Sequence, residues 1–192
     1  FNVLTKKEIK SITKYFTFQN VSMGEPVILG DEISDEILIL IEGNVRLLVE
    51  HPVSKKVVSL NVEKPNYIIG WISNEAKRAE EYITAATDCY FLKVDLSGWQ
   101  EIIRKYPLIL NSINKNIYVA NIWSLIKNLN YLFPEKPNEF QRFIKDLSKH
   151  SLSQTYQSNE EIKGNLDSSL NWYFASDSLS LKFSDKVSLN QL

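Results

Sequence analysis

The chain has 192 residues, of which 44% are hydrophobic and 23% are charged, and its formal net charge is −1. This length predicts one domain of ordinary size with an extension, and the apolar fraction is sufficient for a hydrophobic core. The near balance of 22 basic and 23 acidic residues argues against a dedicated nucleic-acid-binding protein, which usually carries an excess of positive charge.

Neither a membrane-spanning segment nor a signal peptide is predicted. The longest apolar run near the centre, Ile37 to Ile41, is far shorter than the roughly 18 residues that a membrane-spanning helix needs. The N-terminus is polar and no apolar block follows it. Cys89 is the only cysteine, so an internal disulfide is impossible, and a buried, unreactive thiol in a cytoplasmic protein is expected. Because the chain begins with Phe1, we expect a fragment of a longer protein.

Local patterns predict an N-terminal helix followed by a series of short strands. Thr5 and Glu8 have the spacing of a capping box, and apolar residues follow at helical intervals as far as Tyr15. From Thr17 to Val94, segments rich in Val, Ile and aromatic residues alternate with turn residues, which indicates an antiparallel barrel or roll. The expected strands are FTFQNV, PVIL, EILILIE, NVRLLVE, KKVVSLNVE, NYIIGWI, YITAAT and CYFLKV.

Helical patterns interrupt and follow these strands. A short helix capped by Ser73 is expected to run through Ala79. A second helix begins at Asp95 and ends near Pro107, and a long amphipathic helix is expected from Pro107 to Phe133. Its apolar stripe can pack against the chain's own roll or pair two subunits in a homodimer. The stripe consists of Val119, Ile122, Ile126, Leu129 and Phe133.

The last third of the chain is expected to form a separate region. Pro134 and Pro137 end the long helix, and a further short helix is expected from Glu139 to Lys149. Residues 151–169 read as a polar linker, and alternation in the tail predicts one or two strands around Leu181. The predicted domains are therefore residues 1–133 and 134–192, and the second is expected to lead into another domain.

Glycine spacing carries a resemblance to a known fold. Gly24, Gly30 and Gly43 mark tight corners between short strands, because glycine adopts backbone conformations that other residues avoid. In order and spacing these corners, together with the Ala-Ala-Thr-Asp-Cys stretch from Ala85 to Cys89, resemble the cyclic-nucleotide-binding domain. The resemblance covers about Leu4 to Phe133. It implies a mainly β fold with flanking helices: a double-stranded β-helix, or jelly roll, of the CRP and cupin type.

The same resemblance places a ligand pocket near the short inserted helix. The family binds the nucleotide phosphate with an arginine and with the N-terminal amides of that helix, and binds the ribose hydroxyl with a glutamate after Phe-Gly. Here Ile69-Gly70-Trp71 replaces Phe-Gly-Glu, so the hydroxyl acceptor is absent. Arg78 lies one residue before the position expected for the arginine, which is Ala79.

The surrounding charges also disfavour a phosphate. From Trp71 to Glu81 the loop has three acidic residues against two basic ones. Like charges in a partly desolvated site are costly. The candidate ligand-binding residues of this vestigial pocket are Gly70, Trp71, Ser73, Arg78, Ala79 and Glu81, with no cofactor expected and with cAMP and cGMP disfavoured. Trp71 either fills the emptied ribose space beneath the inserted helix or contacts a different ligand or a protein partner.

A narrower resemblance suggests the context. Gly70-Trp71, followed by Glu81 ahead of the segment from Ile83 to Thr87, is similar to the variant fused to cyanobacterial ABC exporters that contain a peptidase. The tail segment from Asn171 to Ser176 resembles a tryptophan-bearing strand that follows that variant. We therefore expect a non-catalytic regulatory or interaction module of a larger transporter-type protein. Its expected partners are other protein domains, without nucleic acid and without direct membrane insertion.

Other functions are alternatives or are excluded. With one cysteine and two distant histidines, His51 in a hairpin and His150 at a helix end, no metal cluster or nucleophile elbow is present, and we expect no enzyme. His51 is expected to be a solvated turn residue. A functional cyclic-nucleotide sensor that uses Arg78 is one alternative. A CRP-like transcription regulator is another, but residues 134–192 contain seven basic and eight acidic residues, where DNA binding requires positive charge.

Overall fold

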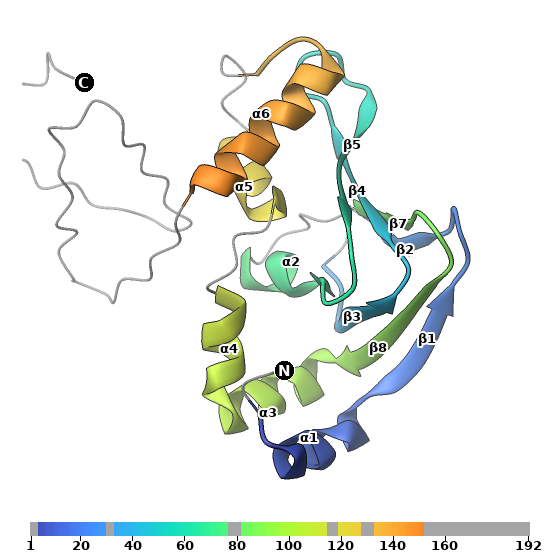
Figure 1. Ribbon diagram of the computed structural model, residues 1–192, viewed down its shortest axis with the longest axis vertical. Coiled ribbons are helices and arrows are strands. Elements are labelled where there is room, and N and C mark those ends of the chain that lie inside the picture. Colours follow the sequence, from blue (N-terminus) through green and yellow to red (C-terminus); the bar gives the residue numbers. More distant parts are fainter. Residues whose placement is uncertain (1–3, 30–32, 77–81, 115–118, 128–132, 152–192) are drawn as a thin grey trace, which may run out of the picture. The chain divides into compact units, whose positions relative to one another are not determined.

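The computed structural model describes residues 4–29, 33–76, 82–114, 119–127 and 133–151 (Figure 1). Their strands form two four-stranded antiparallel sheets, one in the order β1-β8-β3-β6 and the other in the order β2-β7-β4-β5. The strands are β1 (Thr17–Val21), β2 (Pro26–Ile28), β3 (Glu36–Glu42), β4 (Val45–Glu50), β5 (Val57–Glu63), β6 (Ile68–Ile69), β7 (Tyr82–Ala85) and β8 (Cys89–Asp95). This arrangement confirms the predicted β-roll.

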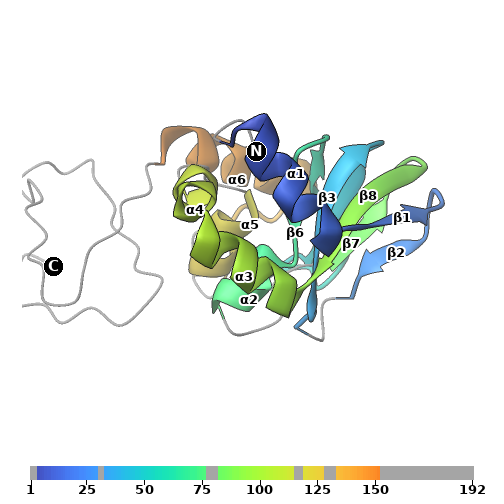
Figure 2. The same ribbon diagram turned by 90° about the horizontal axis from the view of Figure 1, so that it is seen from below.

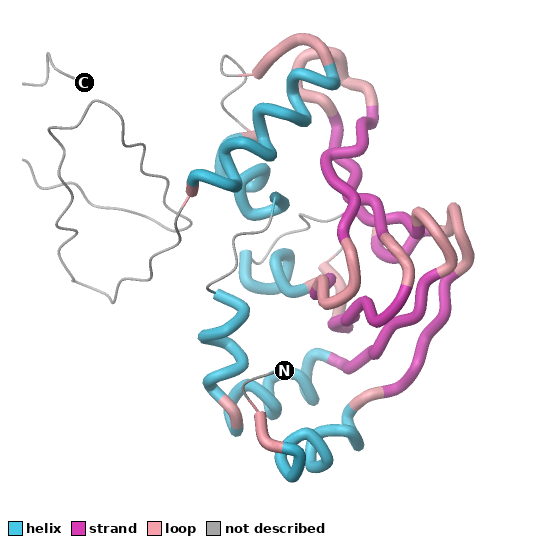
Figure 3. The backbone as a smooth tube through the Cα atoms, viewed as in Figure 1, coloured by secondary structure: helices cyan, strands magenta, loops and turns pink. Residues whose placement is uncertain are grey.

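Helices flank the two sheets. They are α1 (Lys6–Ile12), which continues into a 3-10 turn at Thr13–Tyr15, α2 (Trp71–Ala76), α3 (Leu96–Lys105), α4 (Pro107–Asn114), α5 (Val119–Ile126) and α6 (Pro137–His150). In Figure 3, α1 leads into β1 and α3 follows directly from β8. The expected capping box is present, because the backbone N–H of Thr5 donates to Glu8 Oε2 at 2.7 Å while Glu8 N donates to Thr5 Oγ1 at 3.3 Å. The predicted start of α3 is also confirmed, with Gly98 N donating to Asp95 Oδ1 at 2.6 Å.

Gly43 makes the corner between β3 and β4, as the glycine spacing predicts. Its φ is +91°, and a Cβ at this position would collide with the carbonyl oxygen of Asp88. Only glycine fits such a corner without strain. Gly24 also has a positive φ, whereas Gly30 lies outside the described residues.

The apolar run of β3 is buried on both faces, which explains why it reads as a continuous hydrophobic stretch. Leu38 and Leu40 face an inner cluster, and Ile37 and Ile39 face an outer cluster. The outer cluster joins this sheet to α1, α3 and α4 through Ile12, Ile37, Ile39, Val94, Trp99, Ile102, Ile109 and Ile113. The two faces of this sheet are therefore buried by different parts of the chain.

The inner cluster joins both sheets to α5 and α6. Its sheet residues include Leu38, Leu40, Val45, Leu47, Val49, Leu60, Ile69, Ile83 and Ala85. Its helical and loop residues include Val119, Ala120, Ile122, Trp123, Ile126, Phe133, Phe140 and Ile144. The described part of the predicted stripe thus packs against the chain's own roll. All of these elements belong to one compact unit, Phe1–Tyr156, which ends later than the boundary expected at residue 133.

Several predicted elements differ in extent. Strand NYIIGWI is reduced to Ile68–Ile69, and the inserted helix begins at Trp71, so Ser73 lies inside the helix and does not cap it. The region from Pro107 to Phe133 contains two described helices, α4 and α5, whose buried residues belong to different clusters. Helix α6 confirms the predicted short helix. The predicted linker from 152 onward and the tail strands lie outside the described residues.

Candidate functional site

Gly70 forms the corner that leads into the candidate pocket. It follows the two-residue strand β6, has a φ of +85°, and is buried. A Cβ at this position would lie 2.6 Å from the carbonyl oxygen of Glu36. The close approach of the backbone to β3, together with the left-handed conformation, requires glycine here. The chain therefore turns abruptly from the roll into α2, and Trp71 is the first residue of that helix.

Asn74 fixes α2 against the loop that precedes β3. Its side chain is almost fully buried, and Nδ2 donates to the carbonyl oxygen of Ser34 at 2.7 Å and to that of Gly70 at 2.9 Å. Sequence reasoning did not single out this residue. The available signal was an asparagine four residues after a corner glycine, a spacing that lets its amide return to the glycine carbonyl.

Trp71 is a packing residue at the junction of the two clusters. It is half-buried and contacts the edges of both the inner and the outer cluster. Its ring lies edge-on to Trp99, with 6.1 Å between ring centroids and an interplanar angle of 63°. An indole offers one N–H donor and no acceptor, so it cannot replace a glutamate as acceptor for a ribose hydroxyl.

The structure brings three of the six predicted site residues together. Gly70, Trp71 and Ser73 lie on the corner and first turn of α2, and Ser73 is 1% exposed. Arg78, Ala79 and Glu81 lie outside the described residues, so their roles stay predictions.

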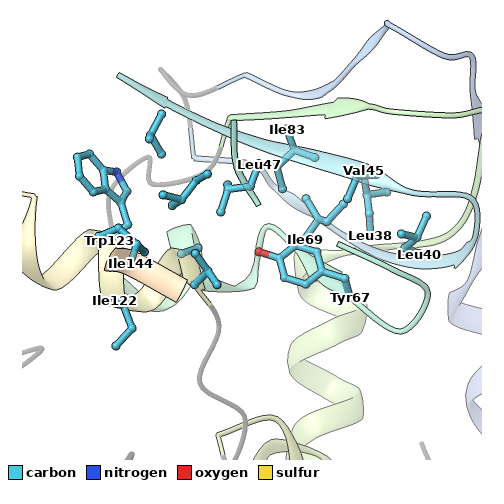
Figure 4. Packing of buried hydrophobic residues seen from close by; sticks show 14 of the residues in the cluster. Leu38, Leu40, Val45, Leu47, Tyr67, Ile69, Ile83, Ile122, Trp123 and Ile144 are labelled. Carbon is cyan, nitrogen blue, oxygen red and sulfur yellow. The ribbon is translucent and has the colours of Figure 1, made fainter. Parts of the chain in front are cut away.

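The wall beside this corner is apolar. Ile69 precedes Gly70, and Ile83 follows on β7; both are fully buried in the inner cluster (Figure 4). Figure 4 also shows Trp123, Ile122 and Ile144 of α5 and α6 grouped at the opposite end of the cluster from Leu38 and Leu40. The strands that border the candidate pocket therefore share one hydrophobic cluster with the C-terminal helices.

Buried polar side chains are few in the described ranges. They are His51, Ser73 and Asn74, together with the buried polar atoms Tyr67 Oη and Trp99 Nε1; no lysine, arginine, aspartate or glutamate is buried among the residues whose burial is described. A buried anion requires charged or multiple hydrogen-bonding partners. The described residues beside the corner offer mainly apolar side chains instead.

Helix α6 packs against β5, an edge strand of its sheet. Gln141 Nε2 donates to the carbonyl oxygen of Ser59, so a side chain of α6 satisfies a backbone group of the edge strand. On the same strand, burial raises the pKa of Glu63, against the opposing effects of the hydrogen bond from Asn61 Nδ2 at 2.7 Å and the charge of Lys145. The seam between β5 and α6 is thus partly polar.

His51 is buried, and the expectation of a solvated turn residue is wrong. Its exposed fraction is 0%. Nδ1 accepts from the backbone N–H groups of Val53 at 3.3 Å and Ser54 at 3.0 Å, which leaves the proton on Nε2 to donate to the carbonyl oxygen of Pro134 at 3.1 Å. The ring also lies edge-on to Phe140, with centroids 4.8 Å apart. Phe140 of α6 thus packs against the imidazole ring, which has no exposed surface.

The described residues contain no group of three or more His, Cys, Asp or Glu side chains that could hold a metal ion. Cys89 is buried, as expected, and its Sγ lies 3.1 Å from the carbonyl oxygen of Asn44. Among the helices in the described ranges, none is long and apolar enough to cross a membrane.

Solved structures share this fold. A catabolite activator protein from Thermus thermophilus matches with a TM-score of 0.53 and 20% identity over 59% of this chain and 53% of that protein. The regulatory subunit of a cAMP-independent protein kinase A from Trypanosoma brucei, a triple mutant bound to cAMP, matches with a TM-score of 0.52 and 13% identity over 59% of this chain and 42% of that one. A Trypanosoma cruzi counterpart bound to guanosine matches with a TM-score of 0.50 and 16% identity over 57% of this chain and 39% of that one.

The chain therefore has the fold of a cyclic-nucleotide-binding β-roll, and the match spans about half or less of each of these proteins. No family model matches the sequence, and no curated protein matches it either.

Proposed function

We propose that this chain is a non-catalytic regulatory or interaction module in which the chain's own C-terminal helices occupy the interior of a cyclic-nucleotide-binding β-roll. One observation carries the proposal. The strand residues that flank the candidate pocket and the residues Trp123, Phe140 and Ile144 of α5 and α6 belong to a single inner cluster.

Energetics favours this closed state over nucleotide binding. Phe140 and Ile144 are fully buried, and Trp123 is 9% exposed. Exposing a fully buried large apolar side chain costs about 1.5–3 kcal/mol, so withdrawing all three costs on the order of 5–9 kcal/mol. A micromolar ligand gains about 8 kcal/mol on binding. Opening the interior would therefore consume most or all of that gain.

The chemistry of the pocket points in the same direction. The described walls contain no buried cation for a phosphate. In the sequence resemblance, Trp71 stands where the family has its ribose acceptor. The Trypanosoma brucei subunit is described as cAMP-independent, and its cAMP-bound form carries three substitutions. The same roll is therefore compatible with regulation that does not use cAMP.

Titration calorimetry tests this proposal directly. The full chain is titrated with cAMP, cGMP and a cyclic dinucleotide, and with guanosine because the Trypanosoma cruzi protein holds that phosphate-free ligand. We expect no saturable heat at micromolar concentrations. Micromolar binding of a cyclic nucleotide that disappears in Arg78→Ala but persists in the matched control Arg104→Ala would establish the alternative, a functional sensor. Saturable guanosine binding would also overturn the closed-interior proposal.

We further propose that the module belongs to a larger ABC-exporter-type protein. The support is the Gly70-Trp71 pair followed by Glu81, together with the tryptophan-bearing tail segment from Asn171 to Ser176. The coding sequence beyond Leu192 tests this proposal. A Cys/His peptidase and a transport cassette are expected there; a helix-turn-helix with a basic recognition helix would support the CRP-like regulator instead.

The proposed partners are other domains of the same protein or of a partner protein. A homodimer through the region from Pro107 to Phe133 is a weaker proposal, because Val119, Ile122 and Ile126 are buried in the chain's own inner cluster. A dimer formed by this region would have to use other faces of α4 and α5.

A further inference from the structure

A group of lysines forms a positively charged face on the first helix. Lys6, Lys7 and Lys10 fall within about a third of the circumference of α1, and Lys14 follows in the 3-10 turn. All four side chains are exposed. We call Lys6, Lys7, Lys10 and Lys14 the lysine face.

The lysine face has no carboxylate partner within the described ranges. Four other lysines make ion pairs at 2.9–3.4 Å, whereas none of these four does; the paired residues are Lys55, Lys93, Lys136 and Lys149. Glu8 is the only acidic residue of α1, and its Oε2 accepts hydrogen bonds from both the backbone N–H and the hydroxyl of Thr5. Local acidic groups therefore leave the charge of the face uncompensated.

A second segment extends the positive surface. Tyr106, at the C-terminal end of α3, lies with its hydroxyl 2.7 Å from Ser11 Oγ of α1. Lys105 Nζ lies 5.3 Å from the centroid of the Tyr106 ring, and Arg104 is exposed beside it. Figure 2 shows α1 and α3 next to each other. Six basic side chains thus lie on α1, the 3-10 turn and α3, whose only acidic side chains are Glu8 and Glu101, although the whole chain has a net charge of −1.

We propose that the lysine face, with Arg104 and Lys105, binds the anionic surface of a lipid bilayer. Clusters of four or more basic residues on a helix are attracted by the negative potential of anionic headgroups. Each basic residue raises the affinity about fivefold. Long, flexible lysine side chains suit a surface of mobile charges rather than the fixed, bidentate geometry that arginine provides.

Exposed apolar side chains close in sequence to the lysine face favour lipid over nucleic acid. Ile9 of α1 is 40% exposed, and Phe18 of β1, which follows the 3-10 turn, is 84% exposed. Such side chains gain free energy at the boundary between headgroups and acyl chains, as in interfacial helices. Peripheral binding of this kind needs no membrane-spanning segment and does not depend on whether the roll binds a nucleotide.

Vesicle co-sedimentation of the full chain tests the proposal. Vesicles of phosphatidylcholine alone are compared with vesicles that contain about 30% phosphatidylserine, at low and at physiological ionic strength. We expect binding to the anionic vesicles only, weakening as salt screens the charges. Replacement of Lys6, Lys7, Lys10 and Lys14 by glutamine should reduce the affinity at least about a hundredfold.

A matched control variant distinguishes the effect of the lysine face from the effect of the total charge. Replacement of Lys55, Lys56, Lys136 and Lys149 by glutamine changes the net charge equally but leaves α1 intact, and should keep the affinity within a few-fold. Circular dichroism and thermal melting verify that both variants fold. Equal loss in the two variants, equal binding to neutral vesicles, no binding to anionic vesicles, or tighter binding to duplex DNA or RNA than to anionic vesicles would each overturn the proposal.

Discussion

The inner and outer clusters bury opposite faces of the same strand, but different parts of the chain cover them. The outer face of β3 is covered by α1, α3 and α4. The inner face belongs to a cluster that also contains residues of the opposite sheet and of α5 and α6, and α6 lies against β5 of that opposite sheet. Trp71, at the start of the candidate pocket, lies at the junction of the two clusters.

This difference distinguishes the part of the fold that supports the roll from the part that adjoins the candidate pocket. The outer cover is formed by helices that flank the strands β1 and β8 directly in sequence, and it would be needed for any function of the roll. Phe140, the most buried aromatic residue that α5 and α6 add to the inner cluster, comes from a helix beyond the domain boundary expected from the sequence. The proposed function takes these helices as the occupant of the roll's interior.

The strongest test of this comparison is to remove the ring of Phe140. Phe140→Ala should lower the free energy of unfolding by about 3–5 kcal/mol, because the ring is fully buried and contacts three other aromatic rings. Urea denaturation measures the change. If α6 only rested on the surface, the loss would be no larger than for Phe18→Ala, an 84% exposed control that should change stability by less than about 0.5 kcal/mol.

The two histidines provide a second test. His51→Ala should destabilise the chain by about 2 kcal/mol, because it leaves the N–H groups of Val53 and Ser54 and the carbonyl of Pro134 without their partner. His150 is exposed at the end of α6, and His150→Ala should cost less than about 0.5 kcal/mol. Thermal melting of the two variants measures the difference in stability. Equal effects would contradict the assignment of His51 as the link between the β4–β5 hairpin and the segment before α6.

Elements defined by local chemistry could be predicted from the sequence. The capping box at Thr5 and Glu8 and the cap at Asp95 depend on residues three positions apart, and Gly43 is required by its own backbone conformation. The alternation of short strands predicted the roll for the same reason. In each case the residues that determine the structure are close in sequence.

Features that depend on distant contacts could not be predicted. The burial of His51 requires Pro134 and Phe140, and the clamp made by Asn74 requires the loop at Ser34. A continuous stripe from Pro107 to Phe133 could not reveal that α4 and α5 pack into different clusters. For the site, the sequence placed Gly70 inside the strand NYIIGWI and assigned Ser73 to a helix cap, whereas the structure has a corner at Gly70 and Ser73 inside α2. Both depend on burial and on the approach of β3, which are not visible locally.

The seam between β5 and α6 offers the finest test, since it is the polar part of the inner cover. Burial raises the pKa of Glu63 above its unfolded value, so the folded state holds the proton more tightly than the unfolded state. Stability attributable to this group is therefore present at low pH and is lost as the pH rises through the folded pKa. Glu63→Gln should raise the free energy of unfolding at pH 7 by less than about 1 kcal/mol, a gain that disappears below about pH 4. Denaturation of this variant at both pH values, with the exposed Glu42→Gln as control, measures the effect. A loss of stability at pH 7 would mean that the attraction of Lys145 outweighs desolvation and that an ion pair holds α6 on the roll.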